Sequence, residues 1–370
     1  MTNYAHITGW GMSVPKLIIT NDHLSQILDT TDKWIQERTG IQQRHIADHR
    51  ETTASLASEA ALRALRIANL LPKEIDLIIV ATSTPEHIFP ATACLVQDHI
   101  GAINAGAFDL SAACTGFIYG LNLATQSIRS GSIKNAIVIG SETLSRIVDW
   151  GDRDTCILFG DGAGAFVVQA SDKPGGVRSA IMRSDGSGGD LLTLPAGGSA
   201  LPASTETINR GLHYIKMSGR EVFRFATRVM EKASREVVEK ANLTLDDIAL
   251  FIPHQANIRI IKAAAHRLNV PLDRFFINLQ DYGNTSTASI PIATCEAIEK
   301  KRLNAGDYFI MVGFGAGLTW GAVTGLWTGP FPTKRRMHIS RYRRIAQLNS
   351  LFRRIWRRIE GLIWGRKNTT

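Results

Sequence analysis

Cys114 is the side chain of this sequence best placed to act as a nucleophile. It lies between an apolar run at 105–110, which predicts a buried strand, and a second run at 115–128, which predicts a helix. Unpaired N–H groups and the positive end of a helix dipole favour thiolate over thiol, so we expect a lowered pKa for Cys114. The alternative is an unreactive core cysteine, because free cysteines are commonly buried.

His254 and Asn284 are the candidate partners of that thiol. His254 follows the apolar run at 247–253, and Asn284 lies in the polar segment 282–286. Taken singly, the alternatives are a hydrogen-bonded core histidine and a turn asparagine. Their positions within an internal repeat favour a shared site instead.

The repeat is visible in the spacing of two apolar runs. Asp76 and Asp247 each open such a run, and they are 171 residues apart. Cys114 follows Asp76 by 38 residues, and Asn284 follows Asp247 by 37. The spacing predicts two copies of one strand and helix unit, each with a mainly parallel sheet.

A further glycine-ended strand is expected in each copy, at 136–140 and at 308–313. Ligands of α/β proteins bind at the carboxyl ends of the strands. We expect Cys114, His254 and Asn284 to lie just past strand ends, where pseudo-twofold packing of the copies brings them together.

Other elements frame these positions. A capped helix is expected between Thr31 and Gly40, and we also predict helices at 53–68 and 219–241 and a strand at 75–82. The cluster 160–164 lacks the Lys-Ser/Thr of a phosphate-binding loop, and 313–317 is interpreted as a turn. Residues 184–211, rich in Gly, Ser and Pro, are expected to form a surface loop or pocket wall.

Composition narrows the class of protein. At 370 residues with 44% hydrophobic residues, the chain is long enough for two globular domains. Its four cysteines form no CxxC pair, which favours a reducing cytoplasm over a zinc site or a disulfide framework. We find no signal peptide and no apolar run long enough to span a membrane.

The net charge of +9 is concentrated at one end. Residues 334–370 hold twelve Lys or Arg and one acidic residue, which leaves residues 1–333 with a net charge of −2. The body of the protein therefore lacks the basic surface that nucleic-acid binding requires.

Four motifs occur in a recognisable order. They are Ala113–Phe117 around the cysteine, Pro253–Asn257 around the histidine, Tyr282–Ser286 around the asparagine, and the glycine-rich Gly313–Gly317. Because these motifs and the duplication occur together, the chain strongly resembles the β-ketoacyl-acyl-carrier-protein synthase III family over residues 1–328.

The resemblance implies an α/β protein of the thiolase fold, a five-layered αβαβα sandwich of two similar halves that works as a homodimer. The expected division is 1–172 and 173–329 for the halves, and 330–370 for a basic C-terminal extension. It also implies decarboxylative condensation of an acyl-CoA, with acetyl-CoA as the expected primer, and malonyl-acyl carrier protein. The product, 3-oxoacyl-acyl carrier protein, starts fatty-acid synthesis, and neither a cofactor nor a metal is expected.

In this resemblance Cys114 forms the acyl-enzyme and releases CoA. The N–H groups of Cys114 and Ala316 form the oxyanion hole. His254, neutral, and Asn284 donate hydrogen bonds to the malonyl thioester carbonyl, which stabilises the enolate left when CO₂ departs.

Further roles follow from the same resemblance. The positions that match the family's CoA site are Thr30, Trp34, Arg38, Arg153, Gly219 and Asn257. Phe314 and Phe89 are assigned to the acyl pocket, with Phe89 reaching across the dimer interface. Arg224, Arg259 and Arg267 match or adjoin a carrier-protein surface. The alternatives are packing aromatics for Trp34 and Phe89 and an ordinary solvated face for Arg267.

The end of the chain departs from the family. Residues 340–367 read as an amphipathic helix, with Ile345, Leu348, Phe352, Ile355, Ile359 and Leu362 on one side and Arg353, Arg354, Arg357 and Arg358 mostly on the other. We expect this helix to lie on an anionic membrane surface, with Trp356 and Trp364 at the interface. The alternatives are a carrier-protein surface, a dimer packing element and a disordered tail.

Two other functions compete with the first. A starter synthase for medium-chain or specialised acyl groups keeps the fold and changes the primer. A non-catalytic subunit that binds acyl-CoA or carrier protein is the third candidate, and the intact cysteine, histidine and asparagine argue against it.

Overall fold

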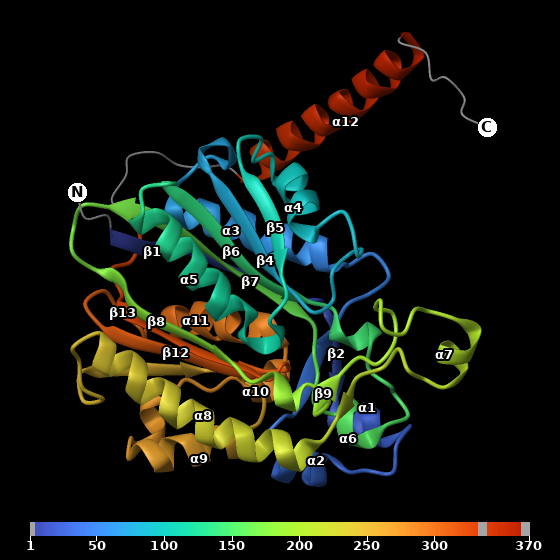
Figure 1. The fold of residues 1–370 in the computed structure, drawn as a ribbon, viewed down its shortest axis with the longest axis vertical. Helices are drawn as coiled ribbons and strands as arrows, with labels where there is room; N and C mark the ends of the chain where they lie inside the picture. Colours follow the sequence, from blue (N-terminus) through green and yellow to red (C-terminus); the bar gives the residue numbers. More distant parts are fainter. Residues whose placement is uncertain (1–3, 332–338, 364–370) are drawn as a thin grey trace.

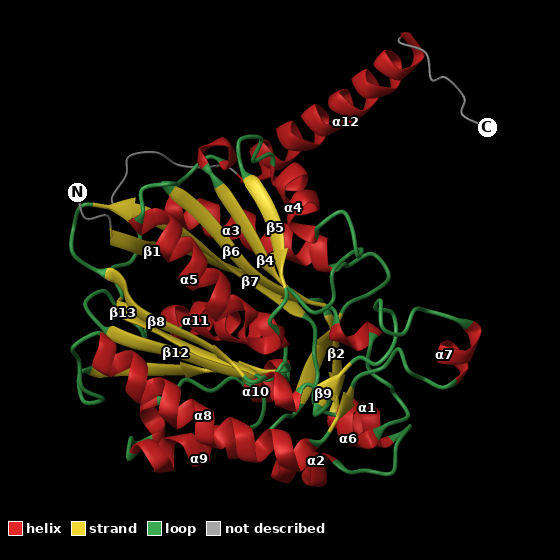
Figure 2. Cartoon of the chain, in the orientation of Figure 1, coloured by secondary structure: helices red, strands yellow, loops and turns green. Residues whose placement is uncertain are grey.

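The computed structural model describes residues 4–331 and 339–363. Two sheets lie between three layers of helices, which gives the five-layered α/β sandwich that the resemblance implies (Figure 1). The helices and strands of each layer are distinguished by colour in Figure 2.

The first sheet contains five strands. Their order across the sheet is β1 (Tyr4–Ser13), β7 (Gly162–Ser171), β6 (Asn135–Glu142), β4 (Leu77–Ala81) and β5 (Gly106–Leu110). The β6–β4 and β4–β5 pairs are parallel, and the β1–β7 and β7–β6 pairs are antiparallel. The apolar sequence of β4 is buried because helices cover both faces of the sheet.

The second sheet contains four strands. Their order is β11 (Ile248–Pro253), β12 (Tyr308–Gly315), β13 (Thr319–Leu326) and β8 (Gly176–Ser184). Only the β11–β12 pair is parallel. The prediction of two mainly parallel sheets is therefore wrong, because antiparallel pairs make up half of the first sheet (β1–β7 and β7–β6) and most of the second (β12–β13 and β13–β8). The predicted turn at 313–317 is also corrected, since β12 continues through Gly315.

Two helices fill the space between the sheets. They are α5 (Gly116–Arg129) and α11 (Ser289–Glu299), which contact strands of both sheets. The first outer layer is formed by α3 (Thr53–Ala68) and α4 (Thr92–Ile100), and the second by α8 (Gly219–Lys240) and α9 (Ile258–Leu268). In the part of the chain that the structure describes, these layers enclose three apolar cores, one between the sheets and one beneath each outer layer, and a fourth, smaller cluster lies among the shorter elements.

The chain passes from one sheet to the other between β7 and β8. We propose that residues 1–172 and 173–329 are the two halves, with 330–370 as the extension, because this crossing lies between Ser171 and Gly176.

Shorter elements surround the open side of the sandwich. They are α1 (Asn21–Ser25), α2 (Asp32–Thr39), α6 (Arg153–Cys156), α10 (Leu279–Tyr282) and the strand pairs β2 (Leu17–Thr20) with β3 (Gln43–Ile46) and β9 (Leu192–Thr193) with β10 (Lys216–Met217). The helix predicted between Thr31 and Gly40 is present as α2. The Thr31 hydroxyl accepts a hydrogen bond from the Trp34 amide, and Gly40 ends the helix in a left-handed conformation.

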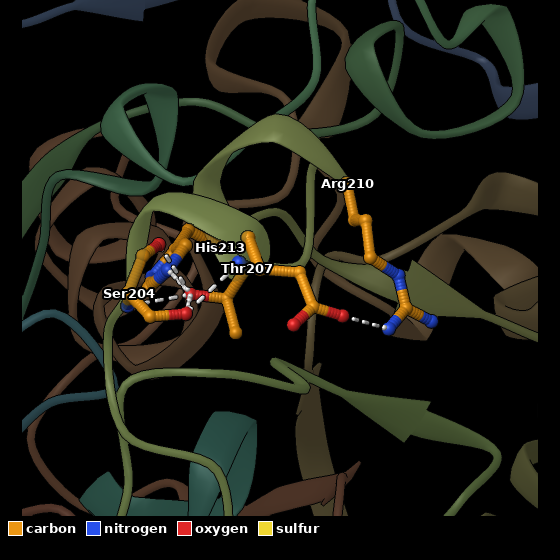
Figure 3. A network of polar contacts seen from close by, with 5 residues as sticks. Ser204, Thr207, Arg210 and His213 are labelled. Atoms are coloured by element: carbon orange, nitrogen blue, oxygen red, sulfur yellow. Dashed lines mark hydrogen bonds and ion pairs between the residues drawn. The ribbon is translucent and has the colours of Figure 1, made fainter.

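Residues 184–211, predicted to form a surface loop or a pocket wall, form both. Asp190 and Leu192 line the large cavity described below, whereas α7 (Thr205–Asn209) projects from the body. Polar contacts hold this projection together (Figure 3). The Thr207 hydroxyl lies 2.9 Å from Nε2 of His213, and Ser204 accepts a hydrogen bond from the Thr207 amide.

The long C-terminal helix α12 (Ile339–Ile363) begins against α4 and α3 and then projects beyond the body (Figure 1). Ala346 is buried against Gly101, and Asp98 of α4 accepts hydrogen bonds from Ser350, Arg353 and Arg354. Although burial opposes ionisation, those hydrogen bonds and the arginine charges hold the pKa of Asp98 below its usual value. In the part of the chain that the structure describes, no helix has the length and hydropathy to cross a bilayer.

This anchorage gives a first prediction. Asp98→Asn removes the charge that holds α12, so the amides of 342–354 should exchange hydrogen about fivefold faster than in the unmodified protein. Hydrogen–deuterium exchange with peptide mass spectrometry measures this. Asp22→Asn, an exposed acid on α1, is the matched control. Equal exchange in both variants contradicts anchorage by Asp98.

Candidate active site

One large cavity opens between the two halves. It has a volume of about 1040 Å³ and is lined by residues from α2, β10, α8 and α9 and from the strand ends. Cys114, His254 and Asn284 all line it, so the structure brings the three predicted side chains into one space. A cavity of this size is large enough for a drug-sized organic substrate.

Cys114 is positioned by the turn between β5 and α5. The single helical turn Ala113–Thr115 connects the two elements, and Ala113 has a positive φ of 44°. Gly315 at the end of β12 lies against this turn, because a Cβ added there would be 2.7 Å from the Cys114 amide nitrogen. The absence of a side chain at Gly315 therefore lets the second sheet approach the nucleophile.

The thiol of Cys114 is not activated as the sequence predicts. Burial raises its pKa to about 12, and the charge of Glu142 adds to the effect, whereas a hydrogen bond with Ser286 opposes it. The predicted lowered pKa is wrong because removal from water disfavours the thiolate more than the helix start favours it. The group at rest is a thiol.

His254 is fixed at the end of β11. Its amide donates to the Val312 carbonyl at 2.8 Å, and its Nδ1 lies 2.6 Å from the Ser289 hydroxyl. The Gln255 amide donates to the same hydroxyl oxygen at 3.4 Å. A Ser289 hydroxyl that donates to Nδ1 leaves the imidazole proton on Nε2.

Burial also determines the charge of His254. It lowers the pKa of the imidazole to about 3, so the ring is neutral near pH 7. The neutral, N–H-donating histidine predicted from the sequence is therefore the form that the structure favours. Phe314 closes one side, its ring centroid 5.3 Å from that of His254 in an edge-to-face arrangement.

Asn284 is held by the first half of the chain. Its amide donates to the Leu158 carbonyl at 2.8 Å, and its carbonyl accepts from the Gly160 amide at 3.1 Å. The Oδ1 atom accepts from the Ser286 amide at 2.9 Å, which leaves the Nδ2 amino group as the donor available to a substrate.

The expectation that Asn284 directly follows a strand is wrong. The residue comes after the short helix α10, and the strand of the repeat is reduced to a single bridge between Phe251 and Phe275. Asn284 is positioned instead by its own bridge to Phe159.

Glu142 is a buried carboxyl beside the site that sequence reasoning missed. It accepts hydrogen bonds from Thr84 at 2.7 Å and from Thr287 at 3.1 Å, which joins the first half to the turn after Asn284. Burial raises its pKa, against hydrogen bonds from Thr84, Ser83, Ser286 and Thr287 that favour the charged form. The sequence signal for Glu142 was an acidic residue just after the apolar strand predicted at 136–140. Ser289, the hydrogen-bond partner of His254, was missed as well, and its signal was the hydroxyl-rich run after Asn284.

Aromatic and guanidinium groups line the outer part of the cavity. Trp34 and Arg38 of α2 lie there with Gly219 and Asn257. The guanidiniums of Arg38 and Arg153 lie 4.9 and 5.1 Å from the centroid of the Trp34 ring. Arg153 and Thr30 do not line the cavity themselves, and Arg153 donates to the Asp29 carbonyl.

Two of the three predicted carrier-protein residues border the cavity. Arg224 and Arg259 line it, and the Arg259 guanidinium lies 5.6 Å from the centroid of the Phe223 ring. Arg267 does not line the cavity but lies 3.8 Å from the Glu231 carboxylate. Among residues 4–331 and 339–363, the structure has no cluster of three or more potential metal ligands.

The two acyl-pocket residues are placed differently. Phe314 is buried in the cavity wall. Phe89 is 84% exposed and does not line the cavity of this chain, so its interpretation as a core aromatic is wrong. Ala316, the second predicted oxyanion-hole residue, follows Gly315 at the cavity wall.

Comparison with known proteins points to one family. The family model of 3-oxoacyl-[acyl-carrier-protein] synthase III matches residues 108–186, and its C-terminal model matches residues 238–327. A beta-ketoacyl-[acyl-carrier-protein] synthase III of Roseiflexus sp. is 51% identical over 328 residues, which cover 89% of this chain and all of the relative. One of Caldanaerobacter subterraneus is 52% identical over 324 residues, 88% of this chain and 98% of the relative.

Solved structures agree. The 3-oxoacyl-[acyl-carrier-protein] synthase III of Aquifex aeolicus superposes with a TM-score of 0.81 at 49% identity, over 87% of this chain and all of the other. A priming β-ketosynthase of a polyketide biosynthetic pathway superposes with a TM-score of 0.82 at 35% identity, over 89% of this chain and 98% of the other.

The buried thiol leads to a pH prediction. Because its pKa is raised to about 12, the Cys114 thiolate fraction should increase about tenfold per pH unit from pH 6 to 9. Iodoacetamide alkylation of a Cys94→Ser protein, followed by mass spectrometry, should increase with the same slope, since Cys94 is the exposed cysteine. The additional change Cys114→Ser supplies the background. A rate that does not change with pH would mean that Cys114 rests as a thiolate.

Proposed function

The chain belongs to the 3-oxoacyl-[acyl-carrier-protein] synthase III family, and we propose that Cys114, His254 and Asn284 perform the condensation that defines it. The protein is an acyltransferase that joins an acyl group to malonyl-acyl carrier protein with loss of CO₂, the first condensation of fatty-acid synthesis. The observation that supports the residue assignment is that the three side chains line one cavity, although they are spread over 171 residues of sequence.

The first step is acyl transfer to Cys114. The sulfur attacks the thioester carbonyl of an acyl-CoA, the C–S bond to CoA breaks, and the proton of the thiol ends on the departing CoA sulfur. The N–H groups of Cys114 and Ala316 stabilise the tetrahedral oxyanion. Attack by a thiol of raised pKa is feasible because the leaving thiolate accepts the proton that the nucleophile loses.

The second step forms the carbon–carbon bond. Nε2–H of His254 and Nδ2–H of Asn284 donate to the carbonyl oxygen of the malonyl thioester, so the electrons released by loss of CO₂ are held as an enolate. The enolate carbon attacks the acyl group on Cys114, the C–S bond breaks, and the Cys114 thiolate takes a proton from solvent. Two uncharged donors suit this step because a carboxylate would repel the enolate.

The reaction as proposed needs no cofactor, since loss of CO₂ from the malonyl group generates the carbon nucleophile. Acyl-CoA is proposed to bind with its base near Trp34 and Arg38 and its pantetheine arm along Gly219 and Asn257. We assign Thr30 and Arg153 to the periphery of that site. The four free cysteines are consistent with a reducing, cytoplasmic location.

We propose that the carrier protein binds where α8 and α9 border the cavity. Arg224 and Arg259 line the cavity and are available to an acidic partner, whereas Arg267 already lies beside Glu231. The proposed order of substrates is acyl-CoA first and malonyl-acyl carrier protein second, because one cavity serves both.

A second copy of the chain is the proposed partner at the edge of the first sheet. β5 is an edge strand, and Ile88, Phe89, Ile103 and Phe108 near it are exposed. An uncovered edge strand with apolar neighbours favours pairing with another chain. Phe89 would then reach the acyl pocket of the partner.

A starter synthase for a longer or specialised primer is the second candidate. The 35% identity to a priming β-ketosynthase of a polyketide pathway favours it. The two candidates share the fold and the three site residues and differ only in the acyl group that the wall around Phe314 accepts.

Primer identity is predicted to show in the mass of the acyl-enzyme. Incubation with acetyl-CoA should add one acetyl group to the protein, and Cys114→Ser should abolish the addition. Intact-protein mass spectrometry with acetyl-, butyryl- and octanoyl-CoA measures it. A shift only with the longer groups supports the second candidate. No shift with any of them contradicts acyl transfer to Cys114.

Separate roles are predicted for the nucleophile and the two donors. His254→Ala and Asn284→Ala should each slow decarboxylation of malonyl-acyl carrier protein about a hundredfold or more, because each removes one hydrogen bond to the enolate. Acylation of Cys114 by acetyl-CoA should persist in both variants. Release of labelled CO₂ and trapping of the acyl-enzyme measure the two steps. Equal loss of both steps would contradict a role confined to the enolate.

A further inference from the structure

One side of α12 presents a continuous apolar row to solvent. Its members are between 41% and 67% exposed, and they are Ile345, Leu348, Leu351, Phe352, Ile355, Trp356 and Ile359. An exposed apolar row of this length on one helix is unusual for an isolated soluble surface and indicates a binding face. The two relatives compared above align with 89% and 88% of the chain.

The apolar row is not the face that docks α12 on the body. Ala346 and Ser350 are buried, and Ser350 and Arg353 contact Asp98 of α4. At 100° per residue, these positions lie on one side of the helix, and Leu348, Ile355 and Ile359 lie nearly opposite. The helix therefore docks through Tyr342 and through small and polar side chains, and the apolar row is directed away from the protein.

The charge of α12 indicates the chemistry of the partner. Residues 339–363 contain seven arginines and one acid, Glu360. Arg344, Arg354, Arg357 and Arg358 are exposed, and of these only Arg354 has an ion pair with a described residue, Asp98. These exposed arginines favour an anionic partner beside the apolar row.

Two other occupants fit less well. A second copy of α12 would place arginine-rich helices together, which like charge disfavours. The carrier protein must reach the cavity, whose mouth is bordered by α2, α8 and α9. Those helices lie at the opposite end of the molecule from α12 (Figure 1).

We propose that α12 binds an anionic lipid surface, with the apolar row at the boundary between headgroups and acyl chains. The arginines contact lipid phosphates, and Trp356 lies at the interface. Because α4 lies on the other side of α12, the body stands away from the membrane and the cavity stays open to soluble substrates. Residues 364–367 of the predicted segment, including Trp364, lie outside the described residues. The inference is independent of the residue roles proposed for the condensation.

Vesicle sedimentation tests the proposal. The full chain is mixed with vesicles of phosphatidylcholine alone, or of phosphatidylcholine with about 40% phosphatidylglycerol, whose negative surface attracts basic segments. We expect cosedimentation with the anionic vesicles only, decreasing as salt is raised. Phe352→Ser with Ile355→Ser should lower the partition coefficient about tenfold or more, because it removes apolar contact. Arg357→Gln with Arg358→Gln should lower it about tenfold.

Lys16→Gln with Lys232→Gln is the control for the arginine pair, since it removes the same charge from exposed positions outside α12. It should partition as the unmodified protein does. Absence of binding to anionic vesicles overturns the proposal, as does equal binding by the apolar-face variant and the control. Vesicle-free self-association that the apolar-face variant abolishes would instead assign the row to a second copy and overturn it. Condensation activity measured without vesicles should be unchanged in every variant, which separates this test from that of the catalytic residues.

Discussion

The candidate site depends on close approach of the two halves at their backbones. Gly315 lies against the Cys114 amide, and a Cβ at Gly140 would be 2.1 Å from the Thr287 carbonyl oxygen. The reciprocal bonds of Asn284 with Leu158 and Gly160 fix the same boundary. These contacts leave no room for a side chain between β12 and the turn that carries the nucleophile, or between β6 and the turn that follows Asn284. The cavity is bordered instead by Trp34, Arg38 and α8.

Burial favours the neutral form of both Cys114, which is anionic when charged, and His254, which is cationic when charged. It raises the pKa of the Cys114 thiol and lowers that of the His254 imidazole, because both charged forms lose water. The resting site is therefore uncharged at these two positions, and in the proposed reaction the charge develops on substrate oxygens that face fixed N–H donors. Such preorganised donors are effective in a site that excludes water. Glu142 joins the halves through its hydrogen bond from Thr287 and does not line the cavity.

Much of this arrangement could be predicted from sequence. The strand before Cys114, the apolar run before His254 and the repeat spacing predicted a shared site, because periodicity and strand ends are local properties of the chain. What could not be predicted depends on packing between distant segments. The thiol pKa depends on complete burial, and the position of Asn284 depends on a bridge to Phe159 rather than on a strand. The orientation of α12 likewise follows from Asp98 on another helix, although its amphipathic pattern was plain in the sequence.

The central claim is that three side chains from the two halves act on substrates held in one cavity. A crystal structure of the protein acetylated on Cys114, with a malonyl-pantetheine analogue that does not lose CO₂, tests it most directly. We predict that Nε2 of His254 and Nδ2 of Asn284 both lie about 3 Å from the thioester oxygen of the analogue, with its reacting carbon facing the acetyl group. An analogue bound elsewhere, or donors directed at two different atoms, would contradict a shared site.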